Sequence, residues 1–142
     1  DIGKRINYYS HARHSAYMIV NSNLYGISHY EQAMCSFMAA DSHGANSKYM
    51  KSSPYGRLLS DDDKGVVHRI SMMLALAEAI DESHEQATVS VSTVIKDDAV
   101  ELTVGTNRSV NTSIAEVAVN KLLKQFKKEY KRTLHVKWCE AL

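Results

Sequence analysis

The chain has 142 residues, of which 44% are hydrophobic and 23% charged, and its formal net charge is +1. These values fit one modest folded domain, or a small domain with an appendage, and they exclude a disordered or collagen-like chain. No uncharged apolar run approaches the roughly 18 residues of a membrane-spanning helix, so we expect no membrane partner.

The start of the chain and its two cysteines indicate a cytoplasmic protein. The chain begins Asp1-Ile2-Gly3-Lys4, with neither an initiator methionine nor the charged-then-apolar pattern of a signal peptide. We therefore expect a piece of a longer protein. Cys35 and Cys139 are far apart and form no CxxC motif, so we expect two reduced thiols and no zinc or redox site.

Helical periodicity runs from the start of the chain to about residue 86. A short apolar helix, residues 15–20, is expected to end at the polar cluster 21–23. Ser28, with Glu31 three residues later, has the spacing of a capping box and predicts the start of a second helix. The buried face of that helix is predicted to hold Ala33, Met34, Phe37 and Met38. Residues 41–63 are polar and are expected to form a long loop or several short turns.

A strong helix is expected to begin at Asp61-Asp62-Asp63, because acidic side chains suit the positive end of a helix dipole. It would be the core helix of this part of the chain. Its buried stripe is predicted to be Val66, Ile70, Met73, Leu74, Ala77 and Ile80.

After Gln86 the hydrophobic period changes from 3.6 to 2. Residues 89–95 read as a half-buried strand, and a turn at 96–99 followed by renewed alternation predicts a β-hairpin. A helix over 113–131 and a last strand around 134–138 complete a β-β-α-β pattern. The inward side chains of that helix are predicted to be Val119, Leu122, Leu123, Phe126 and Tyr130.

The fold class is therefore predicted to be α+β. A mostly helical domain would span residues 1–86, and a small β-β-α-β subdomain would span 87–142. With roughly 55 residues the subdomain is small for independent folding, and we expect it to pack on the helical part.

The first 30 residues carry a specific motif. The segments Asp1–Asn7, His11–Ile19 and Asn21–Ser28 resemble the C-terminal helical region of the Ppx/GppA phosphatases, in which an HxxHSAYxIxNSxLxGxS run follows a His-Asp/Glu-(Ile/Val)-Gly start. A looser resemblance continues through Leu74–Asp81 to the last strand. The resemblance implies an HD-like helical domain and a small α/β tail, following two actin-like domains, in an exopolyphosphatase or a guanosine pentaphosphate phosphatase.

The resemblance also implies that the phosphoanhydride hydrolysis site lies elsewhere. In this family, glycine-rich phosphate loops and magnesium-binding carboxylates belong to the actin-like domains, and the six glycines here are isolated. We therefore expect a non-catalytic domain with no catalytic residue and no cofactor, while Mg²⁺ would serve the parent enzyme's other domains. The implied partners are polyphosphate or a similar polyanion, the protein's own actin-like domains, and a second copy in a homodimer.

Two alternative functions remain open at this point. A free-standing HD metallo-phosphohydrolase would need a His-Asp pair and a distal Asp around its metal. Asp1 matches the Asp of that pair, and Glu78 rather than Asp81 aligns with the distal ligand. Asp1 and Glu78 are therefore the candidate metal ligands, as the remnant of an HD metal site. The other alternative is a protein-interaction module without affinity for anions.

Two groups of basic residues are the candidate polyanion contacts, since a basic groove binds a flexible polyanion by counterion release. A solvated helix face would have the same sequence pattern. The strands offer only Trp138 as an exposed aromatic candidate, which argues against RNA. The candidates are Lys4, Arg5, His11, Arg13 and His14 near the start, and Lys124, Lys127 and Lys128 on the last helix.

Further candidates lie in the middle of the chain. Relatives often have a basic pair where this sequence has residues 41–44, and Lys48 and Lys51 could supply that contact from the loop. His68 is expected to be a satisfied, partly buried histidine rather than a ligand.

Overall fold

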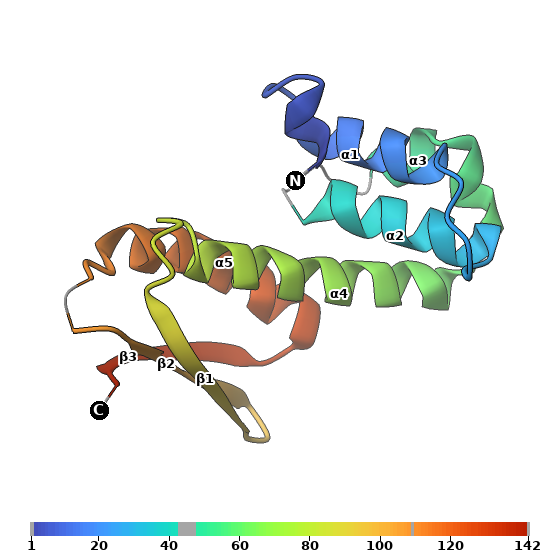
Figure 1. Ribbon diagram of the computed structural model, residues 1–142. Coiled ribbons are helices and arrows are strands. Elements are labelled where there is room, and N and C mark those ends of the chain that lie inside the picture. The colour runs from blue at the N-terminus through green and yellow to red at the C-terminus, as the bar shows by residue number, and fades with distance from the viewer. Residues whose placement is uncertain (1, 43–47, 109, 142) are drawn as a thin grey trace. The chain divides into compact units, whose positions relative to one another are not determined.

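The computed structural model describes residues 2–42, 48–108 and 110–141 (Figure 1). It confirms an α+β fold in which a helical part is followed by a part that contains a three-stranded sheet. The chain divides into two compact units, Asp1–Leu74 and Ala75–Leu142, here called the first and the second unit. The division lies inside a helix, whereas the sequence places a boundary at residue 86, where the strands begin; that domain division stays a prediction.

The first unit begins with the 3-10 helix η1 (Ile2–Arg5), which packs on α1 (His11–Val20). Gly3 makes this close packing possible. Its backbone N–H donates to the buried Ser15 hydroxyl at 2.9 Å, and a Cβ on Gly3 would lie 1.9 Å from the His11 carbonyl oxygen. The Ser-Ala pair of the SAY motif is therefore a packing element, with Ala16 fully buried, whereas Tyr17 is exposed.

Helix α2 (His29–Asp41) packs against α1 and begins with the predicted capping box. The Ser28 N–H donates to the Glu31 carboxylate at 2.8 Å, and the Glu31 N–H donates to the Ser28 hydroxyl at 3.2 Å. One link between the two helices is not visible in the sequence pattern. The buried Gln32 amide donates to the carbonyls of Ile19 and Ser22, each at 2.6 Å, and so satisfies the C-terminal end of α1.

Two short helices occupy the expected turn region, α3 (Lys48–Ser52) and the 3-10 helix η2 (Pro54–Leu58). They complete a core between α2 and the long helix α4 (Asp61–Ile80). The Phe37 ring lies 6.0 Å from the Tyr49 ring, nearly edge-on. The buried residues of this core are Ala33, Phe37, Met50, Leu59 and Val67, with Met34, Met38 and Tyr49 packed around them.

Helix α4 begins at Asp61 as predicted, but the predicted buried stripe is wrong. Ile70, Met73, Leu74 and Ala77 are exposed, and Val66 and Ile80 are only half-buried. The helix is apolar on nearly every side, and a shift of one residue turns the stripe by about 100°, so periodicity could not select the buried face. The buried residues are Val67, Ser71, Met72, Ala75 and Ala79.

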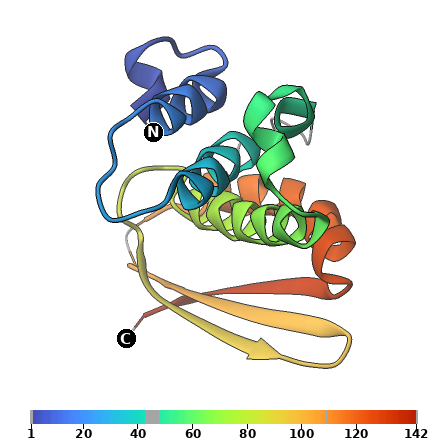
Figure 2. The ribbon, with the colours of Figure 1, turned by 90° about the vertical axis from the view of Figure 1, so that its right-hand side faces the viewer.

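The second unit contains the predicted β-β-α-β pattern. Strands β1 (Thr88–Ile95) and β2 (Ala99–Thr106) form the antiparallel hairpin, seen from a second side in Figure 2. Helix α5 (Ser113–Tyr130) then leads to β3 (Thr133–Glu140), which pairs parallel with β2. The helical crossover permits this parallel pairing, and the strand order is β1-β2-β3.

The core of the second unit lies between α5 and the inner strands. Helix α5 packs against β3, and its predicted inward positions Val119 and Phe126 are buried. The Phe126 and Tyr130 rings stack with centroids 4.6 Å apart. The strands contribute buried apolar residues that include Leu102, Val104 and Leu134.

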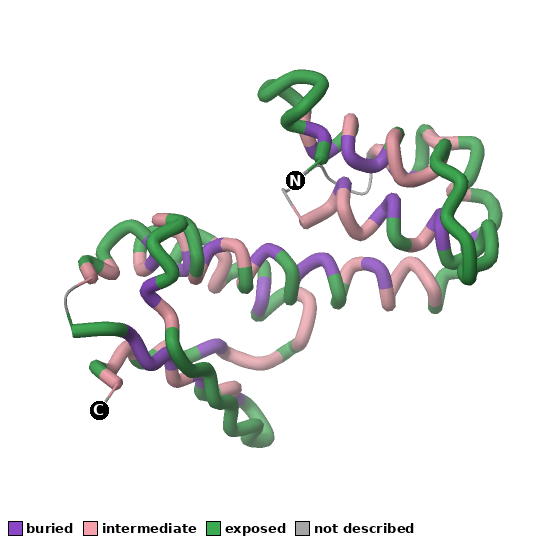
Figure 3. Tube along the Cα trace, in the orientation of Figure 1, coloured by how far each residue is buried: buried purple, intermediate pink, exposed green. Residues whose placement is uncertain are grey.

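Strand β1 is exposed, although the sequence predicts a half-buried strand. Seven of its eight residues, from Val89 to Ile95, are exposed, and Figure 3 draws the strand green along that length. The physical reason is its position: β1 is an edge strand, separated by β2 from the strand that α5 contacts. No helix within the described ranges is long and apolar enough to cross a membrane.

Candidate functional site

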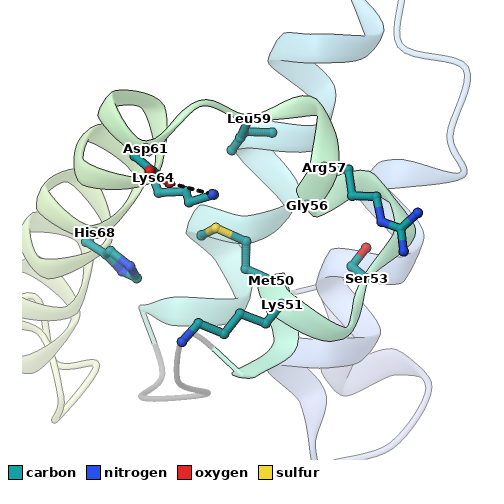
Figure 4. Close-up of a pocket in the computed structure, with 9 residues that line it drawn as sticks. All are labelled: Met50, Lys51, Ser53, Gly56, Arg57, Leu59, Asp61, Lys64 and His68. Carbon is teal, nitrogen blue, oxygen red and sulfur yellow. Dashed lines mark hydrogen bonds and ion pairs between the residues drawn. The ribbon is translucent and has the colours of Figure 1, made fainter.

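A pocket of about 540 Å³ lies in the first unit, where α3, η2 and the first turns of α4 meet (Figure 4). Six of its nine lining residues are polar or charged. The lining residues are Met50, Lys51, Ser53, Gly56, Arg57, Leu59, Asp61, Lys64 and His68.

The sequence between α3 and η2 shapes one wall of this pocket. The Ser53 hydroxyl accepts a hydrogen bond from the Tyr55 N–H at 3.3 Å, and Pro54 occupies the first position of η2. A Cβ on Gly56 would lie 2.1 Å from the Met50 carbonyl oxygen, so only glycine lets η2 pack this closely on α3. This packing brings Arg57 to the pocket.

A second capping box holds the start of α4 beside the pocket. The Ser60 N–H donates to the Asp63 carboxylate at 2.8 Å, and the Asp63 N–H donates to the Ser60 hydroxyl at 3.2 Å. Ser60, and after it the Tyr30 hydroxyl, lower the pKa of Asp63 by hydrogen bonding to its carboxylate. The same bond to Asp63 raises the pKa of Tyr30.

The pocket carries more positive than negative charge. Its lining holds three basic side chains, Lys51, Arg57 and Lys64, and one carboxylate, Asp61. The Lys64 ammonium lies 2.7 Å from the Asp61 carboxylate, and this hydrogen bond lowers the pKa of Asp61. In Figure 4 the Lys51 side chain extends from α3 toward the α4 side of the pocket, to which Lys64 and His68 belong. Such an arrangement suits an anion with several oxygen acceptors.

His68 is held by a partner from α2. Its Nδ1 lies 2.7 Å from the Asp41 carboxylate, whose side chain is 15% exposed. An ionised carboxylate only accepts hydrogen bonds, so Nδ1 carries the proton and Nε2 is the nitrogen left for a ligand. This agrees with the predicted satisfied, partly buried histidine, but the pairing with Asp41 was not predicted.

The candidate residues near the start of the chain lie on two packed elements. Lys4 and Arg5 are exposed on η1, Arg13 is exposed on α1, and His11 and His14 are half-buried there. The His11 ring lies 6.0 Å from the ring of Tyr8. The five residues thus lie on η1 and at the start of α1, and none of them lines the pocket.

The candidates on α5 belong to the second unit. Lys124, Lys127 and Lys128 are all exposed, and the last two lie in the final turn of the helix, where cations suit the dipole.

The remnant HD metal site predicted at Asp1 and Glu78 is not seen in the part of the chain that the structure describes. Asp1 lies outside the described residues, and Glu78 is half-buried on α4. Among the residues described, no group of three or more His, Cys, Asp or Glu side chains is placed to hold a metal ion. Cys35 and Cys139 are free thiols.

Sequence reasoning missed Arg57 and Lys64 as members of the pocket. Lys64 follows three aspartates and has the pattern of an ordinary solvated helix start. Arg57 follows a Pro-x-Gly turn, and no motif spacing connects it with His68. Of the basic residues of the pocket, Lys51 was named beforehand as one that could replace the basic pair of relatives, and His68 was expected to be a satisfied histidine.

The comparisons with known proteins agree with the resemblance in the first 30 residues. The family model described as Ppx/GppA phosphatase, domain III, matches residues 1–125. A search of curated proteins found no match. Because the matched range covers most of the 142 residues, the chain belongs to the Ppx/GppA phosphatase family, as domain III of an exopolyphosphatase-like protein.

Proposed function

We propose that this domain binds the phosphate chain of the substrate of an exopolyphosphatase-like protein and does not itself hydrolyse it. The observation that carries the proposal is a single pocket that Lys51, Lys64 and His68 all line. The ammonium groups of Lys51 and Lys64 are charge-assisted donors that match phosphate oxygens, and His68 Nε2 adds a donor when the ring is protonated. Polyphosphate and guanosine pentaphosphate share this chemistry.

Exposed cations outside the pocket are further proposed contacts, on each unit by itself. A polyanion longer than the pocket can contact further basic side chains, and each contact releases a counterion. Lys4, Arg5 and Arg13 on the first unit and the three lysines of α5 on the second unit are candidates for such contacts. His11 and His14 would add donors when protonated.

The remaining parts of the proposal concern the parent enzyme. Phosphoanhydride hydrolysis and its Mg²⁺ would belong to actin-like domains of the same protein, in the cytoplasm. This domain would contact those domains and a second copy of itself. The support for contacts with protein is the number of large apolar side chains that are exposed, among them Met73 and Leu74 on α4 and Val91 on β1.

Titration of the 142-residue chain with inorganic polyphosphate tests the binding proposal. Lys64→Gln is expected to weaken binding about tenfold, because it removes one charge-assisted contact of about 1.4 kcal/mol. Lys96→Gln is the matched control, since Lys96 pairs with Glu101 in the hairpin and not with the pocket. Binding that falls with added salt, with a smaller salt dependence in Lys64→Gln, is the expected result.

Two other results would contradict the proposal. Absence of binding at low salt would favour the interaction module instead. Phosphate release from polyphosphate by the chain with Mg²⁺ would favour a catalytic domain, and tightly held manganese, iron or zinc after dialysis would favour the HD phosphohydrolase.

A further inference from the structure

The outer edge of β1 is an unprotected edge of a sheet. The strand reads Thr88-Val-Ser-Val-Ser-Thr-Val-Ile95 and contains no charged residue and no proline. Its side chains are exposed, with Val91 at 53%, Val94 at 55% and Ile95 at 71%. Within the described residues β2 is the only strand paired with it. Such an edge offers unpaired N–H and C=O groups to another strand.

The opposite edge of the same sheet is different. Strand β3 carries His135, Lys137 and Glu140, and charged side chains at an edge oppose pairing with another chain. Both edges belong to one small sheet, yet only the β3 edge has this protection. The contrast indicates that the β1 edge is covered in the working protein.

The sequence of β1 is complementary to itself in antiparallel pairing. With Ser92 on a twofold axis, Val91 lies opposite Thr93, and Val89 lies opposite Ile95. All four are β-branched, and cross-strand pairs of such residues stabilise a sheet. No charge of one copy meets a like charge of the other, so the obvious penalty of pairing identical strands is absent.

We propose that β1 pairs antiparallel with β1 of a second copy around Ser92, so that two three-stranded sheets become one of six strands. This inference rests on the proposed homodimer and states which surface forms it. The order across the joined sheet is β3-β2-β1-β1-β2-β3. A twofold axis makes the contact isologous, which closes the assembly at two copies.

Sedimentation equilibrium of the 142-residue chain and of variants at Ser92 tests this pairing. Ser92 is exposed and lies opposite Thr103 within its own hairpin, so substitutions there leave the monomer fold intact. Ser92→Lys places two ammonium groups opposite each other across the axis and is expected to raise the dimer dissociation constant about tenfold. Ser92→Thr is the matched control and is expected to dimerise like the unchanged chain.

A cysteine at the same position tests the register. Residues directly opposite in antiparallel strands have Cα atoms about 4.5–5.5 Å apart, within the range of a disulfide. Ser92→Cys, in a Cys35→Ser background that removes the exposed thiol, is expected to form a covalent dimer on mild oxidation. His135→Cys on the β3 edge, in the same background, is expected to stay monomeric on a denaturing gel.

The outcomes separate this inference from the proposed dimer. A chain that is monomeric at every concentration overturns both. The β1 pairing is overturned, and the dimer left in place, if Ser92→Lys does not weaken the dimer and Ser92→Cys gives no cross-link. The same conclusion follows if Met73→Lys on α4 dissociates the dimer instead. None of these results bears on polyphosphate binding by the pocket.

Discussion

Gly3 shows how one residue sets the geometry at the start of the domain. An alanine Cβ there would lie 1.9 Å from the His11 carbonyl oxygen and 2.5 Å from the Ser15 nitrogen, and both are backbone atoms that cannot rotate away. Gly3→Ala is therefore expected to destabilise the protein by about 3 kcal/mol, the upper part of the range for overpacking. Urea denaturation measures this change.

Gly65→Ala is the matched control for Gly3→Ala. Gly65 lies inside α4, and the nearest atom to its added Cβ is the end of the flexible Arg69 side chain at 3.4 Å. Alanine is the better helix former there, so this substitution is expected to stabilise by about 0.5–1 kcal/mol. Equal effects of the two substitutions would contradict the close packing of η1 on α1.

At the scale of elements, the helix starts make stability depend on pH. Hydrogen bonds from Ser28 lower the pKa of Glu31, and hydrogen bonds from Ser60 and Tyr30 lower the pKa of Asp63. A carboxylate with a lowered folded-state pKa stabilises the fold above its unfolded pKa of about 3.9–4.3. That stabilisation is lost as the pH falls through the folded-state value. Thermal stability is therefore expected to fall with pH below about 4.

Asp63→Asn tests this pH dependence. The variant is expected to melt at a lower temperature than the unchanged chain at pH 7. At low pH the two are expected to approach each other, because the Asp63 carboxylate of the unchanged chain is then protonated and loses the charge that the amide never carries. Asp62→Asn, one residue earlier in the same exposed turn, is the control. Parallel melting curves for the two variants across the pH range would count against the Ser60–Asp63 capping box.

The sequence alone predicts those elements whose signal lies in a few neighbouring residues. The capping box at Ser28 is a local signal, and the helix begins there as expected. The buried face of α4 is not local, because Ile70 and Met73 are as apolar as the buried Val67 and Met72. The exposure of β1 likewise follows from its place at the sheet edge, which alternation of residues does not encode.

At the scale of the whole molecule, the last turns of α4 belong to the second compact unit. Ala75 and Ala79 are buried, so a chain beginning at residue 87 lacks part of the second unit. Residues 75–142 are expected to be more stable than residues 87–142 by about 1–2 kcal/mol, the free energy of burying two small side chains. Circular dichroism during urea titration of both chains measures the difference, and equal midpoints would support a boundary at residue 86.

The sequence by itself determined the fold class, the order of the elements and the family. These depend on periodicity, capping residues and the motif of the first 30 residues, all of which act over short stretches of chain. Only the tertiary structure decided which face of α4 is buried, that Lys51, Arg57, Lys64 and His68 line one pocket, and that Asp41 holds His68. The physical reason is that packing selects among several apolar faces, and a pocket joins side chains whose separation along the chain carries no signal.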